Sequence, residues 1–284
     1  MTLATGVELA VDGLARGLSF ALLGAAITLV FGLGSVLNLA LGSFAVVAVV
    51  VAAAVAGTVG SVAGALAGLV AVVVLGLVVD RTLLSSVYRS AGDERVLLGI
   101  FVTLGLGIAL DGVLFVYFPL SYSLAHGVPG VEAAGVGIRG STILTLVVAA
   151  PLLAGLFGFL GRTRLGTATR TVVYDETGAV LCGVNPRRIR TVVFLLSLSL
   201  AGVAGLLRAA GSEVTVAAGF ELTVFAVVVA IVGGVRDLRG TVVAGLGLGV
   251  VATFAGFLVG SYLSNVLLFG VAVAVLVARP EVIS

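Results

Sequence analysis

Few side chains of this sequence could do chemistry, and two of them lie in or between long apolar stretches. Asp111 lies within the apolar run 96–118, and Asn38 lies in a glycine-rich stretch, 32–44, between two apolar runs. A carboxylate or carboxamide inside a membrane needs polar partners and is typical of a transport pathway. Two alternatives stay open: Asp111 is near enough to the end of its run to reach headgroup water, and the stretch around Asn38 equally fits a tight surface turn.

Catalytic and metal-binding patterns are absent from the sequence. All 15 basic residues are arginine, so the chain lacks the lysine that a Walker-type phosphate loop or Schiff-base chemistry requires. Cys182 is the one cysteine and His126 the one histidine, which excludes an internal disulfide and a histidine-based metal cluster. We therefore expect no catalytic residue, metal or cofactor on this chain. If ATP drives it, ATP and its magnesium bind to partner subunits.

The composition excludes a soluble enzyme. The chain has 284 residues, of which 61% are hydrophobic and 10% charged, and its mean hydropathy is +1.34. Soluble domains average roughly 45 to 50% apolar and about 25% charged residues, so this chain has far more apolar surface than one globular core could bury. The polar residues must therefore be positioned by elements that lie in a membrane.

Long apolar runs divide the whole chain into spanning elements. They lack the period-two alternation of barrel strands, and helices satisfy their own backbone hydrogen bonds in lipid. The expected fold is thus all-α, a single polytopic membrane domain over residues 1–284 with about eight or nine spanning helices. The runs are 17–34, 36–57, 60–79, 96–118, 141–160, 191–210, 219–235, 241–260 and 261–279.

The arginines alternate between two sets of loops. The segments 80–95 and 161–190, the link after 235 and the tail hold 12 of the 15 arginines, whereas the loops 119–140, 211–219 and around 260 hold only Arg139. Since cytoplasmic loops collect basic residues, the first set and the C-terminus are predicted to be cytoplasmic. The side of the N-terminus stays open, because it depends on whether there are eight or nine spans.

The hydrophilic segment 162–190 is predicted to contain a short helix. Asp175 and Glu176 come at its start, Ala179 lies within it, and Gly183 and Asn185 follow. Acidic residues are favourable at a helix N-terminus and glycine is typical beyond its end, so we expect about two helical turns on the cytoplasmic face. Such a helix offers a rigid contact for a partner; a charged loop that merely fixes topology is the alternative.

Glycine spacing and a few charges suggest further roles. Gly60, Gly64 and Gly68, like Gly245 and Gly249, repeat every four residues, a spacing that lets membrane helices approach closely. Charged residues at the outer helix ends are expected to reach water without a clear ion pair. They are Arg208, Glu213 and Glu221.

Three stretches together resemble the permease subunits of branched-chain amino acid ABC importers, in particular the smaller permease of those systems. The matching positions are Asn38, Ala40 and Gly42 of an Asn-x-Ala-x-Gly element, Thr103 and Gly105 of a Thr-x-Gly helix, Arg170, Asp175, Ala179, Gly183 and Asn185 of a coupling loop, and Gly233 and Gly234 of a helix break. The resemblance covers about residues 13–280. Leu41, Arg236 and Asp237 depart from the family pattern, which leaves the solute open.

The resemblance implies half of a translocation pathway for branched-chain amino acids or similar small polar solutes. The implied partners are a second, different permease, two cytoplasmic ATP-binding subunits and an extracytoplasmic solute-binding protein, with no nucleic acid. Residues expected to couple to the ATPase are Arg170, Asp175, Glu176, Ala179, Gly183, Asn185, Arg187 and Arg188; residues expected along the pathway are Asn38, Ala40, Gly42, Thr103, Gly105 and Asp111. An ATP-independent secondary transporter or channel, and a membrane assembly subunit without a pathway, are the alternatives.

Overall fold

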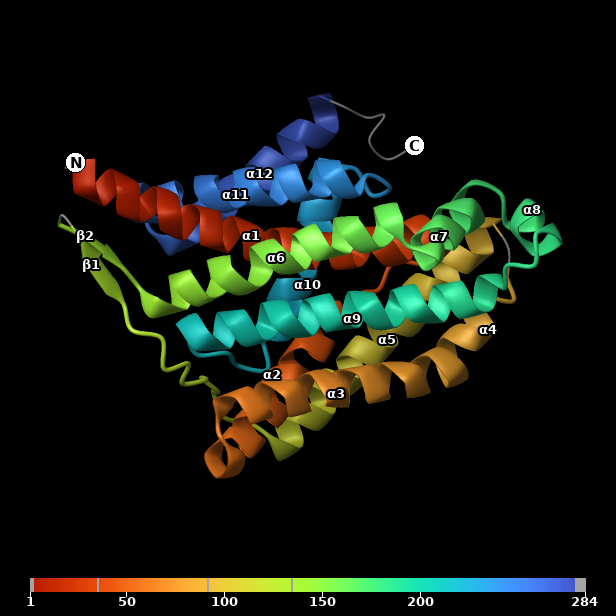
Figure 1. Cartoon of the computed structure of the whole chain (residues 1–284), viewed down its shortest axis with the longest axis horizontal. Coiled ribbons are helices and arrows are strands. Elements are labelled where there is room, and N and C mark those ends of the chain that lie inside the picture. Colours follow the sequence, from red (N-terminus) through yellow and green to blue (C-terminus); the bar gives the residue numbers. More distant parts are fainter. Residues whose placement is uncertain (1–2, 35, 91, 134, 279–284) are drawn as a thin grey trace.

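The computed structural model describes residues 3–34, 36–90, 92–133 and 135–278, and its regular structure is almost all helical (Figure 1). The long helices are α1 (Leu3–Gly34), α2 (Leu41–Val59), α3 (Ser61–Val79), α5 (Gly92–Tyr117), α6 (Gly140–Arg162), α9 (Pro186–Gly211), α10 (Ala218–Gly233), α11 (Leu238–Val259) and α12 (Ser261–Ala278). The short elements are the π-helical segment η1 (Asp80–Leu84), α4 (Ser85–Val87), β1 (Val131–Ala133), β2 (Val136–Ile138), α7 (Arg164–Tyr174) and α8 (Glu176–Leu181).

The expectation of an all-α membrane bundle is confirmed. Among the described residues, seven helices are long and apolar enough to cross a bilayer, and α10 and part of α12 are shorter apolar helices. Helix α10 has 16 residues, so it extends about 24 Å, which is less than the ~30 Å hydrocarbon core. The predicted run 219–235 is therefore a shorter apolar helix, which packs inside the bundle against α1, α2 and α11.

Two predicted helix starts are wrong. Helix α1 begins at Leu3 rather than near residue 17, because its early polar side chains find partners in the loop and helix beside it. Glu8 accepts a hydrogen bond from the Gly137 N–H, and Asp12 accepts one from the Thr142 hydroxyl at 2.6 Å. The run predicted over 36–57 begins its helix only at Leu41, because the residues before it form a non-helical connection.

Helices α1, α2 and α9 form the centre of the bundle. In the most apolar part of each helix, 72% of the α1 residues and 67% of the α9 residues are buried, against 17% for α5. Helix α1 packs against α11, α9, α10 and α6, and α9 also packs against α2 and α3. The outward faces of α3, α5 and α6 are left for lipid or for another subunit.

Close helix contacts rest on the repeated glycines, as the spacing predicts. Gly64 and Gly68 lie against the backbone of α2 at Ala52 and Ala48, so a Cβ at either position would collide with a carbonyl oxygen. Gly245 and Gly249 lie equally close to α1, where a Cβ would collide with backbone atoms of Ala21 and Gly17. Gly60 has a different role, because it forms the turn between α2 and α3 with φ of 99°. Small residues let helices approach where lipid supplies no hydrophobic driving force.

One end of the bundle, called the hairpin end here, carries a small antiparallel hairpin that the sequence analysis did not anticipate. Strands β1 and β2 pair there beside the start of α1, whereas α7 and α8 lie at the opposite end, called the α8 end (Figure 1). Tyr122 and Val214 exchange backbone hydrogen bonds and so join the two loops of the hairpin end. Arg208 and Glu221, for which the sequence showed no clear pairing, form an ion pair at 3.4 Å.

Candidate functional site at the α8 end and the helix break

Helices α7 and α8 together fill the hydrophilic segment after α6. The Thr163 hydroxyl accepts a hydrogen bond from the Gly166 N–H and caps α7, a helix that the sequence analysis did not predict. Helix α8 occupies the position expected for the short helix and is followed by Gly183, whose φ of 81° is in the left-handed region that favours glycine. Asn185 then caps α9 by accepting from the Arg188 N–H.

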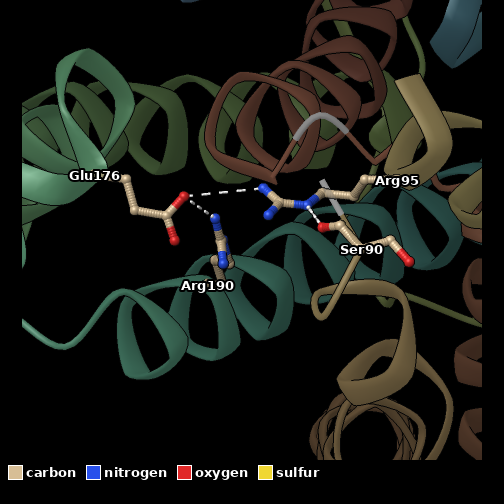
Figure 2. A network of polar contacts seen from close by, with 4 residues as sticks. All are labelled: Ser90, Arg95, Glu176 and Arg190. Atoms are coloured by element: carbon tan, nitrogen blue, oxygen red, sulfur yellow. Dashed lines mark hydrogen bonds and ion pairs between the residues drawn. The ribbon is translucent and has the colours of Figure 1, made fainter. Parts of the chain in front are cut away.

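An ion-pair network ties α8 to two membrane helices (Figure 2). Glu176 Oε2 accepts a hydrogen bond from Nη2 of Arg190 at 2.7 Å and lies 3.9 Å from Nη1 of Arg95. Arg95 in turn donates from Nε to the Ser90 carbonyl at 2.8 Å. One carboxylate of the short helix thereby holds the first turns of both α5 and α9. Neither arginine was selected from the sequence, because their partner lies on a different element.

Arg190 is held from its other side by an aromatic ring. Its guanidinium lies 5.1 Å from the centre of the Tyr88 ring, and its side chain is only 6% exposed. Burial, assisted by the Asp80 carboxylate, raises the pKa of Tyr88, so the phenol stays neutral and acts as a flat face for the cation. Asp80 also accepts a hydrogen bond from the Thr191 hydroxyl at 2.6 Å, which joins η1 to α9.

The tip of this assembly exposes apolar side chains. Tyr174 at the end of α7 is 89% exposed, and Leu181 at the end of α8 is 84% exposed. Ala179, expected to contact a partner, is fully buried instead, so it faces the protein interior and supports the fold of the tip. Four of the charged residues expected at the contact are exposed. They are Arg170, Asp175, Arg187 and Arg188.

The connection between α1 and α2 is a buried helix break held by α5. Asn38 is 1% exposed, and its Oδ1 accepts from the Ala40 N–H at 3.1 Å. The Leu39 N–H donates to the Thr103 hydroxyl oxygen, which also lies 2.9 Å from the Leu37 carbonyl. The described residues of the break, 36–40, are therefore buried or half-buried within the bundle. Asn38 Nδ2 is buried without a hydrogen-bond partner among the described residues.

Helix α2 begins in direct contact with α10. The Gly42 N–H donates to the Thr223 hydroxyl at 2.9 Å, which occupies a backbone donor that the start of a helix leaves free. A Cβ at Gly42 would collide with the Gly219 carbonyl, so only glycine allows this approach. Gly42 therefore has a packing role beside the break.

Two expected pathway residues of α5, Asp111 and Gly105, lie in different surroundings. Asp111 is half-buried beside Gly219 of α10, and its Oδ1 has no hydrogen-bond partner among the described residues. Gly105 is exposed and contacts nothing across the helix, so the structure separates it from Thr103. Gly107, which the sequence analysis did not select, lies beside the break, against Leu39 and Ala40.

One face of α5 links the ion-pair network to the helix break. Arg95, Gly99, Thr103 and Gly107 recur every four residues, the spacing that stacks side chains on one face of a helix. Arg95 meets Glu176, Gly99 lies against Val36, and Thr103 bonds the break. The sequence contains the four-residue spacing of these positions, but only the structure shows which residues they contact.

A second break lies between α10 and α11. Helix α10 ends at Gly233, which packs directly on Thr241, and Gly234 has φ of 99°. Asp237 caps α11 by accepting from the Arg239 N–H at 2.9 Å. The break is therefore a tight turn at the α8 end of the bundle, fixed by two glycines and a cap.

The comparisons with known proteins agree over nearly the whole chain. The family model for "Branched-chain amino acid transport system / permease component" matches residues 9–276. BraD of Pseudomonas aeruginosa, a high-affinity branched-chain amino acid transport system permease protein, is 27% identical over 95% of this chain and 92% of its own. LivH of Escherichia coli, a permease protein of the same description, is 23% identical over 95% of this chain and 92% of its own.

A solved structure shows the same fold. A chain of PsaBC from Streptococcus pneumoniae, determined in complex with Fab, superposes with a TM-score of 0.50 at 16% identity. The superposition covers 94% of this chain and 89% of that chain. At this identity the likeness concerns the fold alone.

Proposed function

This chain belongs to the family of branched-chain amino acid transport system permease components, and from that membership we propose that it carries branched-chain amino acids through the cell membrane in an ATP-driven importer. Its partners are a second permease, two ATP-binding subunits and an extracytoplasmic binding protein. ATP and magnesium bind to the ATP-binding subunits, because this sequence holds no lysine for a phosphate loop. The α8 end and the C-terminus, which lies outside the described residues, face the cytoplasm.

One observation carries the proposal: the exposed apolar tip is connected to two membrane helices by the ion pairs of Glu176. Tyr174 and Leu181 are each more than four-fifths exposed at the tip. Apolar side chains exposed beyond a membrane bundle are typical of a protein interface. Glu176 of α8 contacts Arg95 of α5 and Arg190 of α9. A displacement of the tip by a bound ATP-binding subunit is therefore transmitted to α5 and α9.

Helix α5 transmits this displacement further, from Arg95 to Thr103. Arg95 and Thr103 are eight residues apart, which is about 12 Å along the helix axis. A helix of this length moves as a rod, so displacement at Arg95 also displaces Thr103 and the Leu39 N–H bonded to it. The break beside Asn38 is the element of the pathway that would respond to the ATPase.

Isolation of the native complex with an epitope-tagged chain tests the proposal. The expected result is co-purification of an ATP-binding subunit and ATP hydrolysis that leucine-loaded binding protein stimulates. Leu181→Asp is expected to lose the ATP-binding subunit while the chain still inserts. Leu120→Asp places the same change on an exposed residue of the hairpin end and should keep the complex. Full transport by the purified chain without any ATPase would contradict the proposal and support the secondary-transporter alternative.

A further inference from the structure

A cavity at the hairpin end holds charges of both signs. It has a volume of about 400 Å³ and lies between α1, α6, α9 and α10, within the range of roughly 300 to 1,000 Å³ typical of small-molecule sites. The charged side chains that line it are Asp12, Arg16, Arg139 and Arg208, and its apolar lining includes Phe20 and Leu222. We call it the hairpin-end pocket. It lies at the opposite end of the molecule from the Glu176 network.

The two charges on α1 are neighbours that do not pair with each other. Asp12 and Arg16 are four residues apart on one helix, the spacing at which opposite charges usually interact. The structure has no ion pair between these two described residues. Asp12 instead accepts a hydrogen bond from Thr142, and the Arg16 guanidinium lies 5.5 Å from the centre of the Phe20 ring. Both charges therefore stay available to a ligand.

Arg208 adds a second guanidinium with free hydrogen-bonding capacity. Its Nη2 atom reaches Glu221 at 3.4 Å, but its buried Nε has no partner among the described residues. Arg16 and Arg208 both line the hairpin-end pocket, so their guanidinium groups face the same cavity. Two guanidinium groups that line one pocket are well suited to a carboxylate, which such groups bind through parallel hydrogen bonds.

We propose that the hairpin-end pocket binds the zwitterionic backbone of an amino acid, with the carboxylate at Arg16 and Arg208 and the ammonium group at Asp12. Phe20 and Leu222 then offer an apolar wall for the side chain. The pocket lies within one permease subunit, on the face that receives solute if the α8 end is cytoplasmic. This inference rests on the proposed function for the identity of the amino acid.

Ligand binding to the purified complex in nanodiscs, without the binding protein, tests the inference. Radiolabelled L-leucine is the probe, and L-leucinamide, isocaproate and glycerophosphoethanolamine are the competitors. Leucine is expected to bind and to compete best, because only it presents a carboxylate and an ammonium group on the same carbon. The amide lacks the carboxylate, isocaproate lacks the ammonium group, and the last compound represents a lipid headgroup.

Variants of the pocket then locate the site. Arg16→Gln and Asp12→Asn are each expected to weaken leucine binding about tenfold or more, since each removes a hydrogen bond to a charged group. Arg16→Lys should restore part of the affinity. Arg89→Gln removes an exposed arginine far from the pocket and is the matched control. ATP hydrolysis by each purified complex shows that it is intact.

Three results would overturn the inference. They are no leucine binding to the wild-type complex at millimolar leucine, unchanged binding in both pocket variants, and displacement by the lipid headgroup alone. Each of these leaves the proposed function standing if the ATP-binding subunits still co-purify. Loss of that co-purification would instead contradict the proposed function, whatever the pocket binds.

Discussion

The Glu176 carboxylate of α8 accepts a hydrogen bond from the Arg190 guanidinium of α9 at 2.7 Å, across a separation of 14 residues. Arg190 is buried and Glu176 is 44% exposed, so the pair joins the surface of the tip to the interior of the bundle. Arg95 shares the same carboxylate oxygen at 3.9 Å. This single oxygen therefore contacts an arginine on each of two membrane helices, α9 and α5.

Glu176→Gln is expected to reduce solute uptake about fivefold. A partly exposed ion pair contributes about 1 kcal/mol, and that energy corresponds to a factor of about five in the population of the connected state. The amide keeps the shape of the side chain but loses the charge that holds Arg95 and Arg190. Uptake into proteoliposomes containing the complete importer measures the effect.

Glu94→Gln is the matched control for this change. Glu94 is exposed at the start of α5 and has no ion pair or side-chain hydrogen bond in the described part of the chain. Uptake by this variant should equal that of the wild type. Equal uptake by the Glu176→Gln importer would show that the network does not transmit the motion.

Thr103→Val is expected to lower the free energy of unfolding by about 1 to 3 kcal/mol, because it leaves the Leu39 N–H without its partner. Thr103→Ser keeps the hydroxyl and should stay close to the wild type. Thermal unfolding of the purified complex in detergent, followed by intrinsic fluorescence of its tyrosines or by a thiol probe, compares the variants. Equal melting temperatures for the valine and serine variants would contradict the role given to this hydrogen bond.

Gly42→Ala is expected to destabilise the chain by about 1 to 3 kcal/mol, since the added methyl group collides with the Gly219 carbonyl across the α2–α10 contact. Gly57→Ala, on the same helix, meets no atom within 4 Å and serves as the control. The yield of folded protein after detergent extraction and its melting temperature are the measurements. A Gly42→Ala protein as stable as Gly57→Ala would argue against a close helix contact at the break.

Cys182 allows the sidedness to be measured in the native sequence. It is the one cysteine of the chain and is exposed beside α8. A membrane-impermeant maleimide is expected to label it in inside-out vesicles and to leave it unlabelled in right-side-out vesicles. The Cys182→Ser variant, which has no cysteine, measures the background labelling of this chain. Labelling from the outside would reverse the orientation inferred from the arginines, and with it the assignment of the α8 end to the cytoplasm.

Local patterns were sufficient to predict most of the helices. Apolar runs of about 20 residues can satisfy their backbone only as helices in lipid, so their number and approximate place follow from composition and spacing. The α8 helix was predictable for a similar reason, because Asp175, Glu176 and Gly183 are local start and stop signals. Helix α7 was not predicted, since its polar composition gives no apolar run to detect.

Within the candidate site, the sequence pointed to Asn38 and Thr103 but not to the contact between their segments. Sixty-four residues separate Leu39 from the Thr103 hydroxyl that it bonds, and no spacing in one sequence encodes such a pairing. Gly105 was expected along the pathway, but Gly107 is the glycine of α5 that lies beside the break, and only the rotation of α5 about its axis decides which of the two faces it. The burial of Ala179 was likewise not predictable, because it depends on how α8 packs against α7 and α9.

The sequence by itself determined that this protein is a helical membrane protein that holds no lysine for ATP chemistry, because hydropathy, charge placement and residue absence are properties of the chain alone. Only the tertiary structure decided that Glu176 binds two arginines, that Asp12 and Arg16 remain unpaired in one pocket, and that Arg208 pairs with Glu221. The physical reason is that ion pairs and cavities depend on how helices rotate and pack, and packing is a property of several elements at once.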